Sequence, residues 1–192
     1  TIQTNVTPGL FDSKFGGLPY WLPAMRYPTD SAGEKLILLA QIDLEQIGAN
    51  APLPETGLLQ FLVGRGDNFG ADWGKDVPSG FQVVWHENVD RSLTPEKIRA
   101  MDIPTHADFD YWPVCQEVAV TAQRTTVWMA PSDRRFDTLF AQVWKEVTGH
   151  PPAEPDFRDF LEEPDRNYVY DQLWSSGHCL LGWPCFEQFD PR

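Results

Sequence analysis

The sequence has few cysteines, few basic residues and no long apolar run. Its three cysteines, Cys115, Cys179 and Cys185, cannot all pair within one chain, which favours a reducing, cytoplasmic location. No apolar segment approaches the roughly 20 residues that span a bilayer. The N-terminal residues carry neither the basic nor the apolar region of a secretion signal. These absences predict a protein that neither enters a membrane nor depends on disulfides.

Basic side chains are outnumbered, with 15 lysines and arginines against 28 acidic residues and a formal net charge of −13. Such a charge repels phosphate backbones and anionic lipids, so neither nucleic acid nor a membrane is an expected partner. The same charge favours a basic protein partner. Nucleotide-binding motifs of the types GxGxxG after a strand and GxxxxGK[ST] are also absent, which disfavours a doubly wound nucleotide-binding fold. The oligomeric state is left open.

The chain does contain 17 prolines and 14 glycines, so its strands and helices are expected to be short. Apolar runs predict strands at 36–43, 57–63, 81–87 and 116–123. Helical patterns occur at 44–47, 94–101, 133–148 and 151–165. Because strands and helices do not alternate regularly, these segments predict an α+β fold with a mainly antiparallel or mixed sheet.

The clearest helical pattern lies at 133–148, with Ser132 as the expected cap and Gly149 just beyond the end. Its apolar residues recur at the spacing of one helix face: Phe136, Leu139, Phe140, Val143, Trp144 and Val147. Such a stripe predicts a helix that lies on the core rather than one that forms a groove for a partner.

The segment 151–165 carries six acidic residues and one arginine. Phe157, Phe160 and Leu161 lie at helical spacing within it, so it reads as a solvated acidic helix with apolar anchors. The alternative is a docking face for a basic partner. The residues that would form this face are Glu154, Asp156, Asp159, Glu162 and Glu163.

The stretch "SKFGGLPYWLP" at 13–23 places a serine and a lysine before two glycines. Ser13 and Lys14 are adjacent and would point in opposite directions in an extended chain, so they are not expected to form a catalytic pair. Gly16 and Gly17 could present backbone N–H groups, with Lys14, to an anion. The favoured interpretation is a turn with positive φ that leads the following aromatic residues into the core.

A zinc site built from His178, Cys179 and Cys185, with Cys115 as fourth ligand, matches no common ligand spacing. Cys115 paired with a histidine lacks a local oxyanion loop or elbow, so it is not assigned as a nucleophile. The sequence therefore assigns no catalytic residue, no metal ligand and no cofactor, and leans away from an enzyme.

Four motifs in order carry a resemblance to a known family: "SKFGGLPYWLP" at 13–23, "LLAQIDL" at 38–44, "LPETGLLQFLV" at 53–63 and "GHCLLGWPCFEQFDPR" at 177–192. With them the chain resembles the YwqG family, bacterial proteins of unknown function. The resemblance implies a single domain over 1–192 that lacks the family's C-terminal repeat, and so half of a duplicated architecture. It assigns no catalytic role to any residue. Similar proteins are encoded near secreted toxins, which implies recruitment as immunity proteins.

Two functional hypotheses follow from these observations. The first is a cytoplasmic protein-binding module, an immunity protein whose partner is a basic toxin domain. The alternative is a small-ligand-binding protein or unrecognised enzyme with a pocket near the Gly16-Gly17 loop. The residues expected to line that pocket are Lys14, Gly16, Gly17, Gln41, His178 and Trp183.

Overall fold

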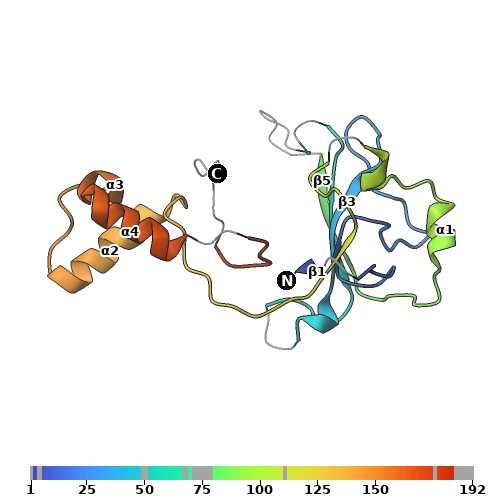
Figure 1. Cartoon of the computed structure of the whole chain (residues 1–192), viewed down its shortest axis with the longest axis horizontal. Helices are drawn as coiled ribbons and strands as arrows, with labels where there is room; N and C mark the ends of the chain where they lie inside the picture. The colour runs from blue at the N-terminus through green and yellow to red at the C-terminus, as the bar shows by residue number, and fades with distance from the viewer. Residues whose placement is uncertain are drawn as a thin grey trace. The chain divides into compact units, whose positions relative to one another are not determined.

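The computed structural model describes residues 2–3, 6–48, 52–66, 69–70, 80–109, 112–174 and 177–183. The chain divides into two compact units, Thr1–Arg124 and Thr125–Arg192, which we call the sheet unit and the helical unit (Figure 1). Each unit is described by itself. The expectation of one domain without a C-terminal repeat stays a prediction.

The sheet unit contains every strand of the described chain: β1 (Ile2–Gln3), β2 (Lys14–Phe15), β3 (Ile37–Asp43), β4 (Leu58–Val63), β5 (Phe81–His86) and β6 (Val118–Val120). It also holds the helix α1 (Pro95–Arg99) and two 3₁₀ turns, η1 (Leu44–Gln46) and η2 (His106–Asp108). The helical unit holds α2 (Phe136–Thr148), α3 (Phe157–Phe160) and α4 (Glu163–Leu173).

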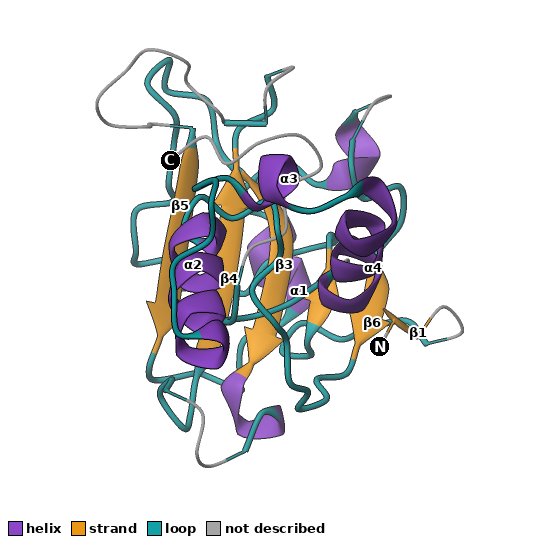
Figure 2. Ribbon diagram, turned by 90° about the vertical axis from the view of Figure 1, so that its left-hand side faces the viewer, coloured by secondary structure: helices purple, strands orange, loops and turns teal. Residues whose placement is uncertain are grey.

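The six strands form one sheet in the order β1-β6-β2-β3-β4-β5, and every neighbouring pair is antiparallel. Figure 2 shows β3, β4 and β5 side by side as the long strands of this sheet. With its four helices the structure is an α+β fold with short strands, which confirms the predicted fold class.

The strands β3, β4 and β5 lie within a residue or two of their predicted ranges, because continuous apolar runs mark them locally. The sheet presents different chemistry on its two faces. One apolar row runs through Phe15, Ala40, Phe61 and Val83, which are paired across neighbouring strands. On β5 this face is open, since Val83 is 50% exposed.

The core of the sheet unit lies on the opposite face and includes Tyr20, Trp21, Leu38, Leu62 and Ile98, each at most 2% exposed. The segment after the two glycines supplies its aromatic part. Gly16 and Gly17 have φ angles of 65° and 75°, the left-handed region that glycine adopts without strain. The predicted turn that leads Tyr20 into the core is thereby confirmed.

In the helical unit, α2 begins at Phe136, three residues later than predicted, with Arg135 and not Ser132 at the N-cap. The delay has a local cause. Asp133 accepts hydrogen bonds from the backbone N–H and the guanidinium of Arg135, which hold these residues in a turn. The predicted end is confirmed, because Gly149 has φ 84° and donates its N–H to the Lys145 carbonyl.

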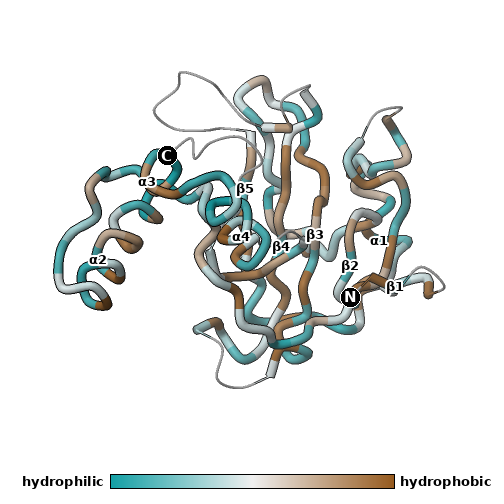
Figure 3. The backbone as a smooth tube through the Cα atoms, turned by 60° about the vertical axis from the view of Figure 1, so that its left-hand side comes forward, coloured by the Kyte–Doolittle hydropathy of each residue, from teal (hydrophilic) through white to brown (hydrophobic). Residues whose placement is uncertain are grey.

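Within the helical unit, the six apolar residues of α2 divide into two groups. Phe136 is buried, and Phe140 and Trp144 pack against aromatic rings of α3. Along another edge of the helix Leu139, Val143 and Val147 are 40%, 48% and 79% exposed. Figure 3 shows this helix as alternating hydrophobic and hydrophilic turns. The apolar stripe is wider than the surface that α3 covers.

The single acidic helix predicted for 151–165 is wrong, because the structure has two helices there. α3 ends at Phe160, and the next two residues, Leu161 and Glu162, have extended backbone angles. Pro164 sits in the first turn of α4, where its missing N–H costs nothing. α4 continues to Leu173, beyond the end of the predicted helical segment at 165.

Candidate functional site

A row of buried polar side chains crosses the core face of the sheet. Lys14, Gln41 and Gln60 are directly paired on β2, β3 and β4, and each is at most 1% exposed. The Gln41 amide donates to the carbonyls of Leu10 and Asp12 at 2.8 and 3.0 Å. Its oxygen accepts from the Tyr20 N–H at 3.1 Å and from Gln60 at 2.8 Å. Both N–H donors of this amide and both acceptor positions of its oxygen are therefore used, and Gln41 holds the segment 10–20 against the sheet.

Gln60 extends the row to His86 on β5. Its amide nitrogen donates to the Tyr20 carbonyl and to Gln41, so its oxygen must accept from His86 Nε2 at 3.0 Å. The network therefore assigns the imidazole proton to Nε2. His86 is 5% exposed, and the rings of Tyr20 and Trp21 meet it edge-on. This burial lowers the pKa of His86 to about 4, which keeps it neutral at physiological pH.

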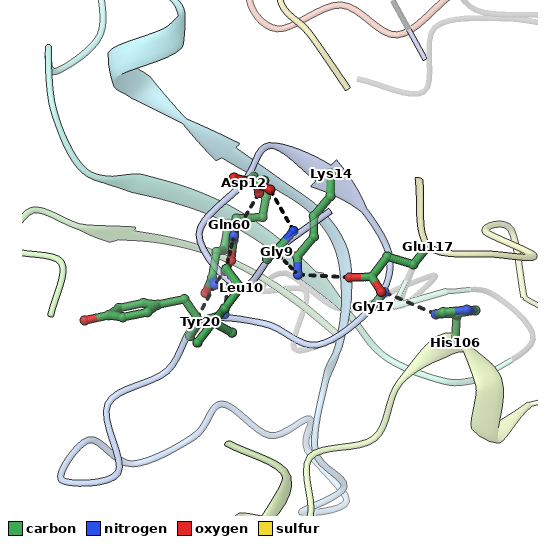
Figure 4. A network of polar contacts seen from close by, with 10 residues as sticks. Gly9, Leu10, Asp12, Lys14, Gly17, Tyr20, Gln60, His106 and Glu117 are labelled. Atoms are coloured by element: carbon green, nitrogen blue, oxygen red, sulfur yellow. Dashed lines mark hydrogen bonds and ion pairs between the residues drawn. The ribbon is translucent and has the colours of Figure 1, made fainter. Parts of the chain in front are cut away.

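Lys14 ends the row on the other side (Figure 4). Its ammonium, 1% exposed, donates to the Gly9 carbonyl at 3.1 Å and pairs with Glu117 at 3.0 Å. Burial lowers the pKa of Lys14, while the charge and hydrogen bond of Glu117 oppose this shift. The carboxylate of Glu117 is 28% exposed, so the pair links the interior to the surface.

The Gly16-Gly17 loop lies next to this pair. Gly16 donates its N–H to the Leu39 carbonyl at 3.0 Å, and Gly17 donates to His106 Nδ1 at 3.1 Å (Figure 4). A Cβ on Gly17 would collide with the Glu117 carboxylate, which rests against its Cα. The two N–H groups proposed for an anion thus have partners inside the protein.

A hollow of about 700 Å³ opens beside Gly17 on the sheet unit. Half of its lining residues come from 99–108, which includes the end of α1, the turn after it and the 3₁₀ turn η2. Its charged or titratable residues are Glu34, Lys35, Arg65, Arg99, Asp102, His106, Asp108 and Glu117. The apolar part of the wall is small and includes Leu18, Ile103 and Pro104. A hollow with this lining suits a strongly polar ligand.

Of the six residues predicted to line a ligand pocket, Gly17 lines this hollow. Lys14 and Gln41 do not line it and belong to the buried row, and Gly16 is buried next to Gly17. His178 and Trp183 belong to the helical unit, where the Arg135 guanidinium stacks 4.7 Å from the Trp183 ring centre. Ligand binding by this set stays a prediction.

The hollow's cationic residues were not predicted from the sequence, since Lys35, Arg65 and Arg99 lie far apart in the chain. No motif marks them, and they come together only when α1 and the segments before β3 and after β4 converge. No local pattern in the sequence marks His106 either. The contact between Gly17 and Glu117 could not be predicted from the sequence either, because the two residues are far apart in the chain.

The acidic residues expected to dock a partner run from just before α3 to the start of α4. Glu154, Asp159, Glu162 and Glu163 are exposed. Asp156 is already used, because it caps α3 by accepting from the Arg158 N–H at 2.8 Å and pairs with the Arg158 side chain. That hydrogen bond helps to lower the pKa of Asp156, although its partial burial acts in the opposite direction. Four of the five side chains therefore point into solvent.

Within the described residues, no three histidine, cysteine or acidic side chains are grouped as a metal site. Cys115 and Cys179 are free and exposed, and Cys185 lies outside the described residues. No helix in the described part of the chain has the length and apolar character to cross a membrane.

By its geometry the chain is an α+β protein with an antiparallel sheet unit, a charged hollow on that unit and a second, helical unit. Residues 13–192 match the family described as Domain of unknown function (DUF1963), and the chain belongs to that family. No curated protein matches the chain. The family's function is uncharacterised, and the narrower YwqG name rests on the sequence motifs alone.

Proposed function

We propose that the protein acts by binding another protein through its helical unit. The observation that carries this proposal is the apolar edge of α2 that the helical unit itself leaves uncovered, formed by Leu139, Val143 and Val147. These side chains lie one helical turn apart, so they form a continuous strip. Apolar strips of this kind mark interaction surfaces when charged residues surround them.

Exposed acidic residues occur elsewhere in the helical unit. Glu162 and Glu163 mark the start of α4, and neither forms an ion pair within the described residues. The whole segment 151–165 has six acids against one arginine. A partner with basic and apolar side chains would complement both features, and electrostatic attraction would speed its association.

The YwqG-like motifs support a narrower form of the proposal. Similar proteins are encoded near secreted toxins, so the partner would be a basic toxin domain and this chain a bacterial, cytoplasmic immunity protein. A net charge of −13 fits that role, since it disfavours nucleic acids and anionic lipids as competing partners.

The charge half of the proposal is tested with a double variant, Glu162→Lys with Glu163→Lys. The matched control carries Glu55→Lys and Glu87→Lys, which make the same charge change at exposed sites of the sheet unit. Affinity purification from native cells should recover a stoichiometric basic protein with the wild type and the control. The helical-unit variant should bind that protein at least about tenfold more slowly at low salt. Equal binding by the two variants, or the absence of a stoichiometric partner, would overturn the proposal.

The apolar half is tested with Val143→Asp, with Gln142→Asp as control on the same helix. Both positions are exposed, so neither variant should lower the thermal midpoint by more than a few degrees. Only Val143→Asp should abolish partner binding. Unfolding of Val143→Asp alone would show that the strip is interior and would remove the observation that supports the proposal.

A further inference from the structure

The hollow on the sheet unit collects positive charge in a protein that has little of it. Three of the 15 basic residues, Lys35, Arg65 and Arg99, line this one site. Four carboxylates face the same space, from Glu34, Asp102, Asp108 and Glu117. The lining therefore offers both signs of charge at close range and is nearly neutral as a whole.

The cations keep donors available. Arg65 pairs with Glu34 at 2.9 Å and Arg99 with Glu96 at 3.3 Å, and all four side chains are roughly half exposed or more. Each guanidinium has five N–H donors, so one such contact leaves most of them unused. Lys35 donates to the carbonyls of Met101 and Asp102, both at 2.8 Å, which hold its ammonium at the end of α1. No carboxylate within the described residues pairs with that ammonium.

The carboxylates of the hollow differ in whether they already have hydrogen-bond or ion-pair partners. Glu117 is paired with Lys14, and Asp108 accepts from the Thr105 N–H and hydroxyl. The side chain of Asp102 has no hydrogen bond or ion pair to any described residue, although its backbone is held at φ 53°. Asp102 is thus the carboxylate that the fold itself leaves unused in this hollow.

His106 adds a neutral donor. Its Nδ1 accepts the Gly17 N–H, so in the neutral ring the proton lies on Nε2. No described residue accepts from Nε2. Because the Gly17 bond fixes the ring at the wall of the hollow, His106 offers an oriented N–H to a ligand.

We propose that this hollow binds a small zwitterion, one with a free carboxylate and a free ammonium, as in an amino acid or a short peptide. Arg99 and the His106 N–H would receive the carboxylate, and Asp102 would receive the ammonium. Leu18, Ile103 and Pro104 would contact the apolar part. A net-neutral ligand is not repelled by a protein of charge −13, whereas a free anion would be. The volume of about 700 Å³ exceeds the needs of a single amino acid and favours a peptide of a few residues.

The probes are alanine, trialanine, trialanine amide and N-acetyl-trialanine, titrated into the full chain by calorimetry and by amide NMR. Trialanine should bind, and loss of either terminal charge should weaken binding about tenfold or more. Alanine binding as tightly as trialanine would identify a free amino acid as the ligand. Absence of saturable trialanine and alanine binding up to about 10 mM would overturn the proposal.

Two variants separate the two ends of the ligand. Arg99→Gln should weaken trialanine binding and leave no difference between the acid and its amide. Asp102→Asn keeps a residue that tolerates positive φ, and it should remove the difference between the free and the acetylated amine. The control is Arg26→Gln, an exposed arginine outside the hollow, which should bind as the wild type does.

If Arg99→Gln and Asp102→Asn bind all four probes as Arg26→Gln does, the site is wrong. Thermal melts of each variant distinguish this result from a loss of folding. The inference uses residues of the sheet unit alone and does not rest on the proposed function. Its failure would leave the protein-binding proposal unchanged.

Discussion

The sheet unit and the helical unit differ in whether a polar network crosses their interior. In the sheet unit, Lys14, Gln41, Gln60 and His86 cross the interior as a hydrogen-bonded row. In the helical unit the interior is a cluster of aromatic rings from Phe136, Phe140, Trp144, Phe157, Phe160, Tyr170 and Trp174.

This difference indicates where each unit has polar groups that are available to a ligand or partner. A buried amide must find all its partners inside the protein, so the polar row holds the segment 10–20 in one position and has nothing left for a ligand. Aromatic rings pack without needing hydrogen-bond partners, and most polar side chains of the helical unit lie at its surface, with Asp133 as a buried exception. Binding is therefore expected at the charged hollow of one unit and at the outer surface of the other, and not in either interior.

The largest effect is expected in the aromatic interior. Phe157 is fully buried, and its ring lies within about 6 Å of the rings of Phe136, Phe140 and Tyr170. Phe157→Ala should lower the free energy of unfolding of the helical unit by about 3–5 kcal/mol, because it leaves a cavity among these rings. Urea unfolding monitored by hydrogen exchange of the α2 amides measures it. Val147→Ala, at a 79% exposed site, is the control and should change little.

The polar row should be nearly as sensitive. Gln41→Ala removes the side-chain partner of the Tyr20 N–H, of one Gln60 N–H and of two carbonyls in the interior. We expect a loss of about 3–4 kcal/mol in urea unfolding. Gln82→Ala on β5 replaces an exposed amide of the same type and should cost less than about 0.5 kcal/mol. Equal losses would mean that the row does not hold the sheet unit together.

The row should also respond to pH through His86. Between pH 6.5 and about 4 the unfolded imidazole binds a proton that the folded one does not. The free energy of unfolding should therefore fall as the pH falls through this window, by up to about 3 kcal/mol. The measurement is the urea midpoint at pH 7 and pH 4.5. His86→Gln should flatten this slope, while His150→Gln, at an exposed site, should keep it. Parallel slopes for wild type and His86→Gln would contradict the assignment.

The smallest effect separates backbone strain from crowding at the edge of the hollow. Gly17 and Gly33 both have positive φ, 75° and 86°. An added Cβ meets the Glu117 carboxylate at Gly17 and nothing within 4 Å at Gly33. Gly33→Ala should cost about 1 kcal/mol from strain alone, and Gly17→Ala about 2 kcal/mol or slightly more. A thermal or urea unfolding series gives both values, and equal costs would show that Glu117 moves aside freely.

Much of this fold could be predicted from local sequence, and the exceptions have physical causes. The strands β3 to β5 and the end of α2 are marked by apolar runs and by Gly149. The two-residue strands β1 and β2 carry no periodicity, since so few residues cannot show a pattern. The apolar stripe of α2 was predicted, but not which of its residues pack on α3, because a stripe reports what can be buried and not what covers it. α4 was missed because its mean composition is polar.

The candidate site could be predicted from the sequence far less well than the fold. Gly17 was picked out beforehand by its glycine pair, yet its neighbours His106 and Glu117 lie about 90 and 100 positions further along. Lys14 and Gln41 were singled out as ligand-binding candidates, and their saturated, buried contacts could be known only from the folded chain.

The sequence by itself determined the properties that arise between neighbours in the chain: the short strands, the turn at Gly16-Gly17, the net charge of −13 and the acidic segment at 151–165. Tertiary structure decided which polar side chains remain available to bind a ligand or a partner. Lys14 meets Glu117 across 103 positions, and Gln41 reaches Leu10 across 31. Desolvation and hydrogen-bond saturation depend on such distant partners, and no local pattern encodes them.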